Sequence, residues 1–127
     1  MSFHFFNRLV TFSLAILITS QPAMAQSFSQ DLQKTLSQGS VNGLAFEDKR
    51  AFTDFYKERG YAPLWRGEGE REDVIKILSS SWIHGFHPAQ YNIKALKLIS
   101  ESENIEDAAP REALFSAAVV KYARDLT

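Results

Sequence analysis

The chain has 127 residues with a formal net charge of −1, and it contains no cysteine. This length favours one domain, and the missing cysteine excludes disulfides, a thiol nucleophile, cysteine metal ligands and a cysteine-linked lipid anchor. Basic residues form no clustered run, which argues against nucleic-acid binding.

Residues 1–25 have the pattern of a cleavable secretory signal peptide. Arg8 precedes a short apolar run, and Ala23-Met24-Ala25 provides small residues at the cleavage positions, so cleavage is expected before Gln26. The apolar run is too short to span a bilayer. We therefore expect an exported, periplasmic protein with no stable membrane anchor after cleavage. The alternatives are an uncleaved anchor or a helix of the fold.

Residues 26–45 are expected to form a weakly ordered N-terminal segment and linker. Phe28, Leu32 and Leu36 are spaced by four, as in one short helix, but the other residues are mostly Ser and Gln. The stretch 37–43 is rich in Ser, Gly and Asn, which is typical of a linker.

The remaining chain, residues 46–127, shows helical periodicity. Helices are predicted over about 47–59, with Gly60 at its end, and over about 70–84, with Gly85 at its end. Between them lies an extended apolar segment, Tyr61 to Trp65, in which a proline disfavours helix.

Two further helices are predicted towards the end of the chain. Asn92 could cap a short helix that carries Ile93, Leu96 and Ile99, and Pro110 fits the first turn of a last helix. Because the apolar stripe of that helix still runs at Thr127, we expect a fragment or a truncated gene product. No alternating run predicts a β-strand, so the predicted fold class is all-α, a small irregular helical bundle.

Residues able to perform chemistry are few. His84 and His87 could start a metal site, but Gly85 and Pro88 interrupt the helix between them and no third ligand has suitable spacing. Ser81 could pair with His84, yet no nucleophile turn is present. The acids of residues 68–73 suit the helix dipole of a first turn. No phosphate-binding glycine loop occurs, and the sequence predicts no cofactor, metal or catalytic residue.

Aromatic side chains are the best candidates for contacting a ligand or partner. Most lie on the apolar helix faces, where core packing is the expected role. Tyr61 and Trp65 in the extended segment are the main exceptions, and Tyr91 is a third candidate.

Two sequence blocks resemble the N-terminal scaffold domain of the large periplasmic L,D-transpeptidases, which carry a YkuD-type catalytic domain. The first block is Phe55 to Arg66, FYKERGYAPLWR, and the second is His84 to Tyr91, HGFHPAQY. The resemblance extends over about Glu47 to Thr127, including the final helix. The departures are His87 in place of the usual acid and Phe86 in place of leucine.

The resemblance implies a non-catalytic module that braces the catalytic domain of an enzyme that cross-links peptidoglycan. The catalytic cysteine of that family has no counterpart here, so no catalytic residue can be carried over. The implied partners are peptidoglycan or the catalytic domain of a cell-wall enzyme. Two alternatives remain open: a stand-alone periplasmic helical binding protein acting through the three aromatics, and a hydrolase that uses Ser81 or His84.

Overall fold

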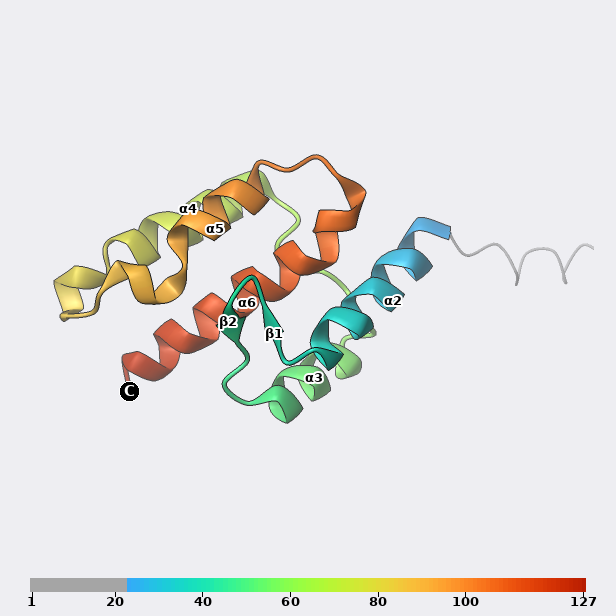
Figure 1. The fold of residues 1–127 in the computed structure, drawn as a ribbon, viewed down its shortest axis with the longest axis horizontal. Coiled ribbons are helices and arrows are strands. Elements are labelled where there is room, and N and C mark those ends of the chain that lie inside the picture. The colour runs from blue at the N-terminus through green and yellow to red at the C-terminus, as the bar shows by residue number, and fades with distance from the viewer. Residues whose placement is uncertain (1–22) are drawn as a thin grey trace, which may run out of the picture.

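A computed structural model describes residues 23–127 as a mostly helical domain, which confirms the predicted fold class (Figure 1). The predicted signal peptide lies outside the described residues except for Ala23–Ala25, which begin the first helix. The elements in chain order are α2 (Ala23–Ser37), β1 (Ser40–Val41), β2 (Leu44–Ala45), α3 (Lys49–Glu58), α4 (Glu68–Ser79), α5 (Ile93–Ser100) and α6 (Ala108–Asp125), with 3-10 turns η1 (Ser81–His84), η2 (Pro88–Tyr91) and η3 (Ile105–Asp107). No helix in this part of the chain is long and apolar enough to cross a membrane.

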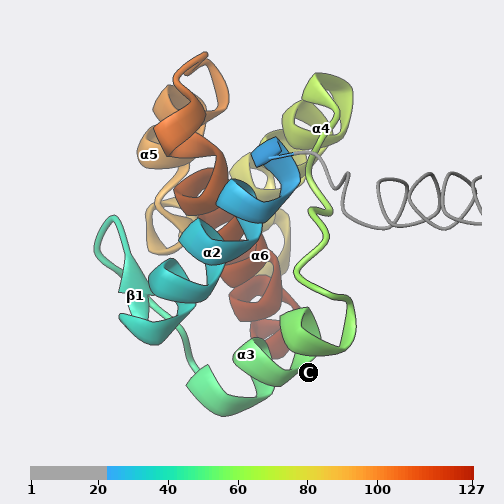
Figure 2. The same cartoon turned by 90° about the vertical axis from the view of Figure 1, so that its right-hand side faces the viewer.

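Helix α6 is the centre of the domain. The other helices surround it, with α2 and α3 on one side and the paired α4 and α5 on the other (Figures 1 and 2). Every residue from Glu112 to Ala118 is buried, so this part of α6 is enclosed on all its faces. The sequence predicts a helix with one apolar stripe here. Alanines and one serine, Ser116, between the large residues allow the neighbouring helices to approach the other faces closely.

The N-terminal segment is more ordered than its composition predicts. Instead of a weakly ordered stretch, residues 23–37 form the 15-residue helix α2. Leu32 and Leu36 are fully buried, and the helix lies against α6. Leucines four residues apart share one helix face, and burial of that face against α6 stabilises a helix that Ser and Gln favour only weakly.

A small β-hairpin replaces the predicted linker. Ser40 pairs with Ala45 and Val41 with Leu44 in an antiparallel register. Asn42 and Gly43 between them both have positive φ, at 46° and 79°. This is the turn geometry that an Asn-Gly pair favours in two-residue hairpins. The absence of a long alternating run therefore did not exclude a strand pair of this length.

The helix ends follow the sequence in part. Asp48 precedes α3 and caps it, accepting a 2.9 Å hydrogen bond from Ala51 N. Gly60 and Gly85 have positive φ, as predicted. Helix α4 ends at Ser79, earlier than predicted, and continues as the turn η1. Asn92 makes no capping bond; its side chain instead donates to Asn42 O at 2.7 Å and connects η2 to the hairpin.

Candidate functional site

The extended segment between α3 and α4 is held against α6 by one buried carboxylate. Glu112 is only 2% exposed. Its Oε1 accepts from the backbone N–H of Leu64 at 2.8 Å, and its Oε2 accepts from that of Trp65 at 3.1 Å. These N–H groups have no helix or sheet partner, so Glu112 satisfies two donors that would otherwise be costly to bury.

A chain of side-chain hydrogen bonds continues from the same carboxylate. The Tyr56 hydroxyl donates to Glu112 Oε1 at 2.6 Å. Since that proton is used, the Ser116 hydroxyl donates to Tyr56 Oη and accepts from the indole Nε1 of Trp65 at 2.8 Å. Burial, followed by the nearby Glu112 charge, raises the pKa of Tyr56 well above its ordinary value. The tyrosine therefore stays a neutral donor.

Arg71 binds the backbone carbonyls of the same segment. Its guanidinium Nη1 donates to Trp65 O and Arg66 O, both at 3.0 Å. Its Nε donates to Ser100 Oγ at 3.1 Å, which joins the beginning of α4 to the end of α5. Trp65 therefore has its N–H, its carbonyl and its indole all fixed, and the conformation of this segment is set by α4, α5 and α6 together.

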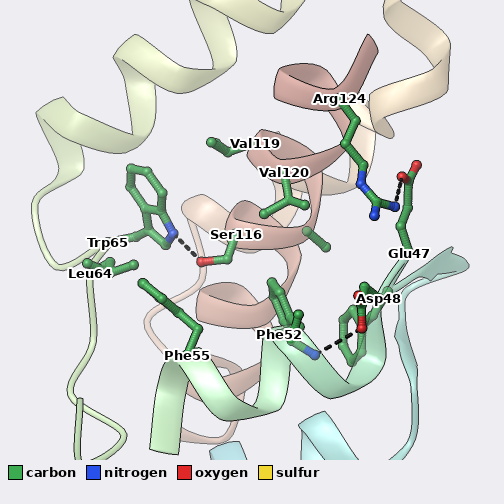
Figure 3. A pocket seen from close by; sticks show the side chains of 13 residues that line it. Glu47, Asp48, Phe52, Phe55, Leu64, Trp65, Ser116, Val119, Val120 and Arg124 are labelled. Atoms are coloured by element: carbon green, nitrogen blue, oxygen red, sulfur yellow. Dashed lines mark hydrogen bonds and ion pairs between the residues drawn. The ribbon is translucent and has the colours of Figure 1, made fainter. Parts of the chain in front are cut away.

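An apolar groove of about 410 Å³ lies beside this fixed segment (Figure 3). Its walls come from α3, from Leu64 and Trp65, and from the C-terminal half of α6. The lining residues are Phe46, Glu47, Asp48, Ala51, Phe52, Phe55, Leu64, Trp65, Ser116, Ala117, Val119, Val120 and Arg124. The polar groups among them are largely engaged, because Arg124 donates to Glu47 Oε2 at 2.8 Å and Ser116 serves Trp65 and Tyr56.

The three predicted contact aromatics are not brought together. Trp65 is half-buried and lines the groove. Tyr61 is half-buried with a φ of 59°, packs against the core and does not line the groove. Tyr91 is fully buried, and its hydroxyl donates to Asp125 Oδ2 at 2.7 Å. Burial raises the pKa of Tyr91, as does this bond. Tyr91 is therefore a core residue that offers no surface to a partner in this structure.

The other predicted chemistry finds no support in the geometry. Ser81 is fully buried, so its hydroxyl cannot reach a substrate, whereas His84 is exposed. Ser81 is therefore not placed to act as a nucleophile beside His84 in this structure. Within residues 23–127, no three His, Asp or Glu side chains gather as a metal site would require.

Sequence reasoning missed the residues that organise this site. These residues are Glu112, Arg71 and Ser116, and none of them belongs to the motifs or periodic patterns described above. The available signal was the spacing of Glu112 and Ser116, which places a carboxylate and a hydroxyl on one helix face among the apolar residues 113–120. Polar groups at such positions need partners, and the partners lie about 50 residues away along the chain.

This arrangement defines a class of protein: a small helical module in which buried polar side chains hold an extended backbone segment in place. The model of the family described as "Scaffold domain" matches residues 50–127, and the chain therefore belongs to the Scaffold domain family. The matched region includes both Glu112 and the segment that it holds. No curated protein and no solved structure shows a significant match to this chain.

Proposed function

We propose that this chain is the non-catalytic scaffold module of a periplasmic L,D-transpeptidase, the enzyme class that cross-links peptidoglycan. Membership of the Scaffold domain family supports the scaffold role, and the two sequence blocks support the particular enzyme. One observation carries the proposal. Trp65, in the first sequence block, is held through its backbone and its indole by Glu112, Ser116 and Arg71. The most distinctive residues thus build a rigid support.

The groove favours a protein partner over a glycan. Sugars are bound through hydrogen bonds together with aromatic stacking, but the polar groups in this groove are largely engaged and the Trp65 indole N–H already donates to Ser116. Phe55 and Val120 remain exposed at its edge. An apolar cleft of this kind fits aliphatic or aromatic side chains. We propose that it receives such side chains from the catalytic domain of the enzyme.

Export to the periplasm is part of the same proposal. Cleavage before Gln26 would remove three residues from the beginning of α2, whereas the buried residues of that helix are Leu32, Thr35 and Leu36. Processing at this position would therefore leave the contact between α2 and α6 intact. Cell fractionation followed by N-terminal sequencing tests this: we expect a periplasmic product that begins at Gln26, and a cytoplasmic product would contradict it.

Binding to an isolated L,D-transpeptidase catalytic domain tests the scaffold role. We expect the full chain to bind this domain in calorimetry, with Val120→Asp abolishing binding because it places a charge in the groove. Ile105→Asp is the matched control, since it alters an exposed apolar residue outside the groove. Binding to purified cell-wall sacculi without any binding to the catalytic domain would instead favour the stand-alone binding protein.

A further inference from the structure

Large apolar side chains are exposed at the far end of the helical arm that α4 and α5 form. The arm ends in η1 and η2, the yellow region at the left of Figure 1. Trp82 and Ile83 in η1 are 67% and 64% exposed. Neighbouring side chains therefore cover little of either one. Tryptophan in particular is rarely left this exposed without a partner.

Charge is strongly segregated along the same arm. Between Asp73 and Glu101 the sequence has no acidic residue, while Lys76, Lys94 and Lys97 are all exposed. The bond from Arg71 to Ser100 joins the beginning of α4 to the end of α5, so the two helices run antiparallel. The acids that flank the stretch therefore lie together at the base of the arm. The rest of the arm carries only positive charge, although the whole chain has a net charge of −1.

The one described carboxylate that bonds to η2 from another element is already matched. Asp125 on α6 accepts from the Tyr91 hydroxyl, and its Oδ2 lies 3.5 Å from Lys121 Nζ. The negative charge of Asp125 is therefore balanced locally by Lys121. The histidines at the end of the arm, His84 and His87, are exposed and add positive charge when protonated.

We propose that the end of this arm is a peripheral membrane-contact surface, which places Trp82 and Ile83 in the interface of a bilayer that contains anionic lipids. Tryptophan favours the headgroup region of bilayers, and lysines close to an anionic surface each strengthen binding. The exposed large apolar side chains of η1 and η2 are Trp82 and Ile83, whereas a specific protein interface involves about 20–30 residues on each partner. A lipid bilayer, in contrast, can accommodate a small protruding group, because its molecules rearrange around an inserted side chain.

Tryptophan quenching by brominated lipids tests this surface directly. The full chain has two tryptophans, so the signal of Trp82 is the difference between wild type and Trp82→Phe. With vesicles of acyl-brominated phosphatidylglycerol we expect quenching that Trp82→Phe removes, and with brominated phosphatidylcholine we expect little. Because Trp82 is mostly exposed, Trp82→Phe should keep the circular dichroism spectrum of the wild type.

Lysine variants test the electrostatic part. Replacing Lys76 and Lys94 together by alanine should raise the vesicle concentration for half-maximal quenching by roughly 25-fold, about fivefold for each lysine. Lys34 and Lys57, exposed on α2 and α3, are the matched control pair and should have little effect.

Several results would overturn the proposal. They are unquenched Trp82 with phosphatidylglycerol vesicles, equal quenching with phosphatidylcholine, or quenching that persists in Trp82→Phe and therefore comes from Trp65. Binding of soluble polyglutamate that depends on the arm lysines, with Trp82 unquenched by vesicles, would identify a surface for acidic proteins instead. These readouts do not depend on the proposed link to L,D-transpeptidases.

Discussion

Replacing Glu112 by glutamine tests how much the buried carboxylate contributes to holding the Leu64–Trp65 segment. Glutamine has nearly the same shape, but its amide oxygen can replace only one of the two carboxylate oxygens as an acceptor. If that oxygen keeps the bonds from Tyr56 and Leu64, the amide NH₂ faces the N–H of Trp65. Two donors then oppose each other, and the backbone N–H of Trp65 loses its partner.

The expected cost follows from these contacts. A buried donor left without a partner costs about 1–3 kcal/mol, and each remaining bond weakens when its acceptor changes from charged to neutral. The lower cost of desolvating an amide offsets part of this. We expect Glu112→Gln to lower the free energy of unfolding by about 2–4 kcal/mol, a large share of the roughly 5–15 kcal/mol that stabilises a domain.

Urea unfolding followed by tryptophan fluorescence measures this change. The midpoint should fall while the slope stays constant, which indicates lost stability and not a less compact state. Glu72→Gln is the matched control, because Glu72 is exposed on α4 and its replacement should change stability by no more than about 0.5 kcal/mol. A Glu112→Gln variant as stable as this control would refute the assignment of Glu112 as a residue that holds the segment.

The remaining predictions concern other fixed points of the fold. Arg71→Lys should lower stability by about 1.5–3 kcal/mol in urea unfolding, because lysine cannot donate to two carbonyls and to Ser100 from a planar fork; an unchanged midpoint would contradict this. Gly85→Ala should cost about 1 kcal/mol in the same assay because of the φ of 82°, since a Cβ there would meet no neighbouring atom and only backbone strain contributes. Tyr56 and Tyr91 both have a folded-state pKa above the ordinary value of about 10, so their contribution is fully present below pH 10. This contribution to the free energy of unfolding is lost as the pH rises above 10, at about 1.4 kcal/mol per pH unit for each tyrosine. Melting curves between pH 8 and pH 11 should show this loss, with a shallower decline for Tyr56→Phe. A stability that does not change over this range would contradict the prediction.

Local signals in the sequence were sufficient for the fold class and for several helix ends. Helical periodicity identified α3, α4 and α6, and Gly60 and Gly85 marked positions of positive φ. These features depend on neighbouring residues and on backbone sterics alone, so a sequence displays them directly. The Asn42-Gly43 turn belongs to the same group, and its hairpin could have been predicted from that pair.

Contacts between distant parts of the chain decided the rest. The order of α2 depends on burial of Leu32 and Leu36 against α6, and the exposure of an aromatic depends on which helices surround it. Tyr91 and Trp82 illustrate this, since the first is fully buried and the second is 67% exposed. Periodicity gives the face on which a side chain lies, but it does not reveal whether another element covers that face.

The sequence by itself determined a small, cysteine-free helical chain with an FYKERGYAPLWR block of scaffold-domain type. Only the tertiary structure decided what that block does. It joins Trp65 to Glu112 through its backbone N–H and to Arg71 through its carbonyl, across separations of 47 and 6 residues. The physical reason is that an extended segment leaves its backbone donors and acceptors unpaired, and partners for them come from whichever buried polar groups the packing of the helices places beside it.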